Sequence, residues 1–211
     1  MREGSSSAIR RPLLVVIDMQ VVFADPTSAW CAPGFAGAVP GVRALLDGFG
    51  RRAVFTRFVA PRRPAGAWVE YYRQWPFALQ PPDAPLWDLV PELAVDGRTV
   101  LDAPTFGKWD DRLASRVDPP AGIVLSGVST DCCVLSTALA AADAGVTVRV
   151  AADACAGASD VDHQRALDAL ALYAPLVTIT SVAQVLAELE AQHKAGLKAA
   201  PAERAGIAPS A

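Results

Sequence analysis

Two short apolar runs constrain the fold of this chain more than any other feature of its sequence. One spans residues 12–18 and the other residues 122–128, and both are rich in Val, Ile and Leu. Such runs are typical of strands in a parallel sheet that is covered on both faces. Residues 134–144 follow the second run, are rich in Ala and Leu, and contain no Gly or Pro. This composition predicts a helix directly after the second strand.

The rest of the chain repeats this alternation of strand and helix. Four further strands are predicted at residues 52–58, 98–102, 146–152 and 176–179, and four further helices at 39–49, 108–117, 159–173 and 181–192. The alternation of six strands with helices predicts a three-layer α/β domain with a mainly parallel sheet and right-handed crossovers. A chain of 211 residues, 52% of them hydrophobic, is long enough for one such core.

The predicted domain spans residues 12–192 and leaves a tail at each end. Residues 1–11 are Ser-rich and residues 193–211 are rich in Ala and Pro. Both segments have few apolar side chains to bury, so we expect the first to be disordered and the second to be loose.

Residues 60–91 form an insertion that is too long for an ordinary connection between secondary-structure elements. The insertion contains seven prolines and many aromatic residues. Its aromatic side chains could line a ligand pocket or be buried against a neighbouring subunit. We take Trp68, Tyr72 and Trp75 as candidate substrate-binding residues. Arg57, just before the insertion, is a candidate partner for a substrate carboxylate.

Composition excludes several classes of partner. A net charge of −3 argues against nucleic acid and against a polybasic membrane-binding surface. No apolar run approaches the roughly 20 residues that span a bilayer, and the first residues lack the apolar core of a signal peptide. We therefore expect a cytoplasmic protein with no membrane partner. The four cysteines form neither a disulfide framework nor a zinc pattern, so we expect them to be reduced.

Two side chains at strand ends are the candidates for chemistry. Cys133 lies in the first turn of the helix after the second apolar run, where the helix dipole favours a thiolate. Asp18 ends the first run, and ligands of open parallel sheets bind beyond the carboxyl ends of the strands. The two residues could therefore meet in one crevice. The simpler alternatives are that Cys133 is a packing residue and that Asp18 caps a loop.

Elimination points to a carboxylate as the base for Cys133. The chain has two histidines, and His163 stands near the start of a predicted helix, where a capping or packing role is the simpler interpretation. No cluster resembles a catalytic zinc site, and neither a dinucleotide fingerprint nor a phosphate loop is present. We therefore expect no metal and no cofactor. Asp18 could accept the thiol proton and later return it to a leaving amine.

These residues together resemble the isochorismatase-like cysteine hydrolases. The resemblance covers residues 13–189 and rests on Asp18-Met19-Gln20 with Phe23, on Gly127-Val128-Ser129-Thr130 followed by Cys133-Val134 and Thr137-Ala138, and on Asp153-Ala154 with His163. It implies a six-stranded Rossmann-like sheet and an Asp-Lys-Cys triad that hydrolyses amide or ureido C–N bonds through a thioester. It also implies a homodimer or a larger assembly.

The resemblance assigns further roles in the site. It identifies Cys133, rather than Cys132, as the nucleophile. It implies a cis peptide bond between Val128 and Ser129 and an oxyanion hole formed by the amides of Ser129 and Cys133. Gln20 and Phe23 become candidate substrate-binding residues.

The sequence departs from the family pattern in two places. Ala103 stands where the family has its triad lysine, so Lys108, five residues later, is the candidate third member; the alternative is a surface lysine. Nicotinamidase-like members bind a metal after the second strand, but residues 55–60 contain no ligand for one. This favours a metal-free amidohydrolase that acts on a carbamoyl, ureido or maleamate-type substrate.

Two other functions stay open at the level of sequence. The missing lysine at position 103 is compatible with a catalytically silent member of the fold that binds a ligand or responds to redox state. Metal-independent cleavage of a vinyl ether, as in isochorismatases proper, is the other alternative. The aromatic insertion and Arg57 suggest a flat or anionic small molecule as the ligand.

Overall fold

A computed structural model describes residues 11–118 and 121–199, which fold around one six-stranded parallel sheet. The strands are β1 (Leu13–Ile17), β2 (Ala53–Phe58), β3 (Thr99–Ala103), β4 (Ile123–Val128), β5 (Val148–Ala156) and β6 (Val177–Thr180). Their order in the sheet is β3-β2-β1-β4-β5-β6, with every neighbouring pair parallel. The predicted three-layer α/β fold is therefore confirmed.

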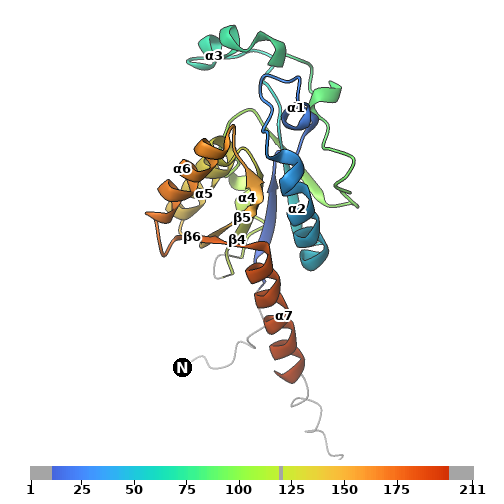
Figure 1. Cartoon of the computed structure of the whole chain (residues 1–211), viewed down its shortest axis with the longest axis vertical. Helices are drawn as coiled ribbons and strands as arrows, with labels where there is room; N and C mark the ends of the chain where they lie inside the picture. The colour runs from blue at the N-terminus through green and yellow to red at the C-terminus, as the bar shows by residue number, and fades with distance from the viewer. Residues whose placement is uncertain (1–10, 119–120, 200–211) are drawn as a thin grey trace, which may run out of the picture.

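Helices cover both faces of the sheet. They are α1 (Val21–Ala24), α2 (Phe35–Phe49), α3 (Trp68–Gln74), α4 (Asp111–Ala114), α5 (Leu135–Asp143), α6 (Asp160–Ala171) and α7 (Val182–Ala199), with single 3-10 turns at η1 (Pro76–Ala78) and η2 (Pro85–Trp87). Figure 1 shows α2 and α7 on one side of the sheet and α4, α5 and α6 on the other. In the described part of the chain, no helix is long and apolar enough to cross a membrane.

The position of β1 in the middle of the sheet explains why its sequence is apolar without interruption. Leu14 and Val16 pack into the core under α2 and α7, whereas Val15 and Ile17 pack into the core under α4, α5 and α6. Both faces of β1 are buried, so neither set of alternating positions can be polar. The order of the strands reverses between β1 and β4, and the carboxyl ends of these two strands form the crevice where such sheets bind ligands.

Several predicted boundaries were wrong. The helix predicted at residues 108–117 spans only Asp111–Ala114. It begins after Asp110, because the Asp110 side chain accepts hydrogen bonds from the backbone N–H groups of Arg112 and Leu113 and caps the helix start. Helix α2 begins at Phe35, before the predicted residue 39, and continues through Pro40.

The predicted loose tail from residue 193 was also wrong in its first part, because α7 continues to Ala199. The other predicted tail segments, residues 1–10 and 200–211, lie outside the described residues.

The insertion at residues 60–91 lies over the end of the sheet that carries the crevice. It contains α3, η1 and η2, and Figure 1 shows α3 at the end of the molecule opposite α7. Tyr72 and Trp87 from this segment are buried in the same core as Phe58 of β2. The prolines and aromatic residues of the insertion therefore form a packed cover over the site.

Candidate active site

Close contact between β1 and β4 positions the nucleophile segment. Gly127 has a φ of 108°, and a Cβ atom on this residue would lie 2.1 Å from the carbonyl oxygen of Ile17. Only glycine allows this approach, which brings the end of β4 against the end of β1. The peptide bond between Val128 and Ser129 is cis, as the resemblance implies. Cys133 follows in the π-helical turn Thr130–Val134 (η3), which continues into α5.

Asp18 is held rigidly at the end of β1. Its side chain is fully buried and its backbone has a φ of 48°, a left-handed conformation that Asp tolerates better than most residues. The Oγ1 of Thr56 donates a hydrogen bond to Oδ1 of Asp18 at 2.6 Å, and it accepts one from the Asp18 backbone N–H at 3.3 Å. The second carboxylate oxygen, Oδ2, faces the ammonium group of Lys108.

Lys108 is buried beside this carboxylate. Its Nζ lies 2.9 Å from Oδ2 of Asp18, and the side chains of the two residues are 1% and 0% exposed. Nζ also donates to the carbonyl oxygen of Thr105 at 2.7 Å and lies 4.9 Å from the centre of the Phe58 ring. These partners compensate for the loss of water around the ammonium group. Lys108 is therefore not a surface lysine.

A chain of hydrogen bonds joins the Lys108 loop to the backbone of Cys133. The backbone N–H of Lys108 donates to Oγ1 of Thr137 at 2.9 Å, and the same hydroxyl donates to the carbonyl oxygen of Cys133 at 2.6 Å. Thr137 is fully buried on α5. The structure thus brings together Asp18, Lys108 and Cys133, the three residues predicted for the triad.

The protonation state of Cys133 differs from the prediction. The residue is only 3% exposed, and this burial raises the pKa of its thiol well above the ordinary value. The charge of Asp18 raises the pKa further, while the ammonium of Lys108 lowers it. The expectation of a thiolate favoured by the helix start was wrong, because burial, followed by the charge of Asp18, raises the pKa of this thiol. The raised pKa favours the neutral thiol at Cys133.

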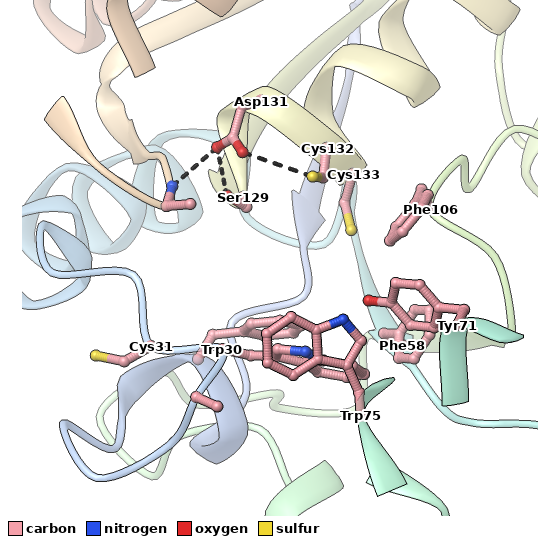
Figure 2. A pocket seen from close by; sticks show the side chains of 13 residues that line it. Trp30, Cys31, Phe58, Tyr71, Trp75, Phe106, Ser129, Asp131, Cys132 and Cys133 are labelled. Carbon is pink, nitrogen blue, oxygen red and sulfur yellow. Dashed lines mark hydrogen bonds between the residues drawn. The ribbon is translucent and has the colours of Figure 1, made fainter. Parts of the chain in front are cut away.

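A cavity of about 400 Å³ opens above Cys133. Figure 2 shows the Cys133 sulfur pointing towards a set of rings on the far side of this cavity. We call this set the aromatic wall; it consists of Phe23, Trp30, Phe58, Tyr71, Trp75 and Phe106. The side that carries Cys133 is formed mainly by Ser129, Asp131 and Cys132.

Two of the predicted substrate-binding residues, Phe23 and Trp75, line the cavity. Gln20 does not, and its prediction was wrong. Its amide nitrogen donates to the carbonyl oxygens of Phe58 and Trp87 at 3.0 and 2.8 Å, and its amide oxygen accepts from the Phe58 N–H at 2.7 Å. The side chain of Gln20 therefore fastens β2 to the end of the insertion.

Trp68 and Tyr72 were also predicted to bind substrate, and neither lines the cavity. The ring of Trp68 packs behind the wall, 5.2 Å from the Phe106 ring centre. Tyr72 is 2% exposed and lies in the core. Both residues support the wall from outside because α3 turns only one of its faces, with Tyr71, towards the cavity.

Arg57 was wrongly predicted to meet a substrate carboxylate. The register of β2 and β3 places it opposite Asp102, and its guanidinium makes two hydrogen bonds of 2.8 Å to that carboxylate. The pair lies outside the cavity.

Sequence reasoning missed Trp30, Tyr71 and Asp131. Trp30 lies in a loop without periodicity, and its ring centre is 5.9 Å from that of Tyr71. Asp131 lines the cavity and accepts hydrogen bonds from Ser129 Oγ at 2.6 Å and from the Ala158 N–H at 2.9 Å. The available signal was an aspartate two residues before the motif cysteine, Cys133.

Three further predictions concern the oxyanion hole, His163 and a metal site. The carbonyl oxygen of Ser129 accepts from the N–H groups of Cys132 and Val134 at 3.2 and 3.1 Å, and the role of the Ser129 and Cys133 amides as an oxyanion hole stays a prediction. The ring of His163 hydrogen-bonds Thr130 Oγ1 at 2.8 Å, which is a packing role. Within the described residues, no three His, Cys, Asp or Glu side chains are grouped to hold a metal ion.

Comparison with solved structures supports the fold. A cysteine hydrolase from Pseudomonas syringae pv. phaseolicola is similar with a TM-score of 0.76, 20% identity and coverage of 88% of this chain and 95% of that one. An isochorismatase family protein from Desulfovibrio vulgaris gives a TM-score of 0.73, 23% identity and coverage of 86% and 99%. N-carbamoylsarcosine amidase from Thermoplasma acidophilum gives 0.64, 20% identity and coverage of 82% and 96%.

Sequence comparisons identify the family. Isochorismatase domain-containing protein 2 of Xenopus laevis is 39% identical over 82 residues, which is 37% of this chain and 40% of that protein. The chain therefore matches less than half the length of this curated relative. The model of the isochorismatase domain matches residues 12–184, which is most of the chain. With the six-stranded sheet, this match shows that the chain belongs to the isochorismatase family of hydrolases.

Proposed function

We propose that this protein is a cysteine hydrolase that cleaves the C–N bond of a small amide, carbamoyl or ureido compound through a thioester intermediate. The observation that carries the proposal is the buried ion pair between Asp18 and Lys108 beside the thiol of Cys133. A buried pair of this kind is costly to maintain without a role. The thiol, the carboxylate and the ammonium supply a nucleophile, a base and a positive charge.

Acylation begins from the neutral thiol. Sγ of Cys133 attacks the carbonyl carbon while its proton passes to Asp18, and the C=O electron pair moves onto the oxygen. Asp18 is the acceptor, because its side chain is hydrogen-bonded to this thiol and its charge acts on it. The amides of Ser129 and Cys133 donate to the oxyanion. When the oxyanion collapses, the C–N bond breaks and Asp18 returns the proton to the leaving nitrogen.

Deacylation uses the same groups, and Asp18 again accepts a proton and then returns it. Water attacks the thioester carbonyl while Asp18 accepts one of its protons, and a second oxyanion forms. Its collapse breaks the C–S bond and releases the carboxylic acid. The proton on Asp18 passes back to Sγ, which restores the resting thiol. Lys108 keeps its charge throughout and stabilises the negative charge that builds up on Asp18, sulfur and oxygen.

A panel of primary amides and ureido compounds tests the proposal, with ammonia release as the measurement. Cys133→Ala should abolish turnover, and Asp18→Asn should lower kcat by about 10²–10⁴-fold through loss of the base. Mass spectrometry of rapidly quenched enzyme should detect an acyl group on the peptide that contains Cys133. The matched control is Cys155→Ala, which removes a buried cysteine of β5 outside the cavity. Turnover that survives Cys133→Ala would contradict the proposal.

A further inference from the structure

The cavity above Cys133 carries charge of one sign. Among the residues that line it in the described part of the chain, Asp131 is a carboxylate and none is Lys, Arg or His. Burial raises the pKa of Cys132 to about 12 and also raises the pKa of Tyr71, so both side chains are neutral at pH 7. The ammonium of Lys108 is paired with Asp18. One uncompensated negative charge therefore faces the cavity.

Aromatic rings form the opposite side of the cavity. Trp30 lies in the middle of the aromatic wall, and its ring centre is 6.2 Å from Phe23, 5.6 Å from Phe58, 5.9 Å from Tyr71 and 6.3 Å from Trp75. Such rings present negative faces that attract cations and repel anions. Figure 2 shows Trp30, Trp75 and Tyr71 across the cavity from Asp131 and Cys133.

Asp131 is fixed in place and retains an acceptor. Its Oδ1 accepts from Ser129 Oγ at 2.6 Å and from the Ala158 N–H at 2.9 Å, which holds the carboxylate still. Its Oδ2 accepts a weak bond from the Cys132 thiol at 3.5 Å. A carboxylate with one anchored oxygen and one weakly bonded oxygen is suited to receive a positive group.

We propose that the cavity selects a small amide whose acyl portion carries an alkylated ammonium group, with that group between Asp131 and the aromatic wall. This inference rests on the proposed function, because it places the amide carbonyl at Cys133. An anionic substrate would meet both the carboxylate and the negative ring faces, so the expectation of an anionic ligand is replaced. Alkylated ammonium groups lose little hydration on entering such a cavity, and cation–π attraction partly replaces it.

Two amides of the same shape test the charge preference. Trimethylammonioacetamide and 3,3-dimethylbutanamide differ in one atom, a quaternary nitrogen in place of a carbon, and malonamate supplies the opposite charge. We expect kcat/KM for ammonia release to be at least about tenfold higher for the cation than for its neutral isostere. Malonamate should be the poorest substrate. Equal values for the first two amides, or a preference for malonamate, would overturn the inference.

The variant Asp131→Asn removes the charge and keeps the shape. Asn retains the oxygen that accepts from Ser129 and Ala158, so the loop should stay anchored. The ratio of kcat/KM between the cationic and the neutral amide should fall by about tenfold. The control is Asp143→Asn, an exposed aspartate at the other end of α5, which should leave the ratio unchanged. An unchanged ratio in Asp131→Asn would contradict the role of this residue.

A binding measurement separates this inference from the proposed function. Trp30 and Trp75 line the cavity, so ligands should change the tryptophan fluorescence of the Cys133→Ala protein. Tighter binding of the cationic amide without turnover by the wild type would refute the hydrolase proposal and support the cation site. Turnover of both amides with equal binding would support the hydrolase proposal and refute the cation site. Failure of both amides to bind would also overturn the inference, and this measurement needs no substitution at Asp131.

Discussion

Two ion pairs near the carboxyl edge of the sheet have almost the same length and very different surroundings. Asp18 and Lys108 lie 2.9 Å apart with side chains that are 0% and 1% exposed. Arg57 and Asp102 lie 2.8 Å apart with side chains that are 22% and 44% exposed. Water screens the second pair, which should be worth less than about 1 kcal/mol. The first pair has lost its water and depends on protein partners.

The two pairs differ in burial, and it is the buried pair to which the proposed mechanism gives a role. The sequence marked both Lys108 and Arg57 as site residues. Lys108 is buried because Thr137 fastens its loop to α5 beside Cys133. Arg57 faces Asp102 because adjacent parallel strands place the two residues in register. The two pairs have nearly the same length, so the distance does not distinguish them; their positions relative to the cavity and to Cys133 do.

The largest effect is expected from breaking the buried pair. Lys108→Met removes the ammonium and leaves the Asp18 carboxylate buried without its counter-charge. The free energy of unfolding should fall by about 3–5 kcal/mol, as for other buried pairs that lose one partner. Equilibrium unfolding in urea measures the change, and ammonia release from a hydrolysed amide should be lost in parallel.

The matched control for Lys108→Met is the double variant with Asp18→Asn. Asn at position 18 can still accept from Thr56 and carries no charge, so the double variant should be more stable than Lys108→Met alone. If the two changes were simply additive, the stability would not depend on the pair. Activity should stay absent in the double variant, because the base is also gone.

A smaller effect is expected on the reactivity of the thiol. Burial raises the pKa of Cys133, so less thiolate is present at pH 7 than in a free cysteine, and alkylation by iodoacetamide should be slower than that of N-acetylcysteine. The rate should rise about tenfold per pH unit in the alkaline range, since thiolate is the reacting form. Quantifying the alkylated peptide by mass spectrometry distinguishes Cys133 from the other cysteines.

The rate of Cys133 alkylation also compares the buried pair, Asp18 and Lys108, with the exposed pair, Arg57 and Asp102. Lys108 lowers the pKa of Cys133, so Lys108→Met should slow alkylation further, whereas Arg57→Met should leave it unchanged. Alkylation at the rate of a free thiol at pH 7 would show that Cys133 is ionised at rest, contrary to its burial.

Much of the fold and part of the site follow from local sequence patterns. The apolar runs of β1 and β4 predict buried parallel strands because their apolar side chains pack alternately into the cores on the two faces of the sheet. Asp18 could be predicted because it stands at the end of such a run, and the end of a strand is visible in the sequence. The turn after the second run indicated a thiol at the start of a helix, and the resemblance to the family identified Cys133 rather than Cys132.

The missed residues depend on contacts between distant segments. Trp30 belongs to the site because the insertion folds back over its loop and brings Tyr71 against it. Gln20 was misassigned because its amide satisfies backbone groups of Phe58 and Trp87, which lie 38 and 67 residues away. A local sequence pattern cannot predict such distant partners. The thiolate was wrongly expected for the same reason, since the burial of Cys133 is a property of the assembled core.

The smallest effect is expected from the exposed pair, and it completes the comparison. Arg57→Met should change the free energy of unfolding by no more than about 1 kcal/mol, because water already screens the guanidinium and because Met keeps the apolar part of the side chain in place. Added salt should weaken this small contribution further and leave that of Lys108 nearly unaltered, since buried charges are screened less. Urea unfolding at two salt concentrations measures both responses. A loss of several kcal/mol in Arg57→Met, or of activity towards cationic amides, would mean that Arg57 acts on the site through β2 and that exposure is a poor guide to which pair matters.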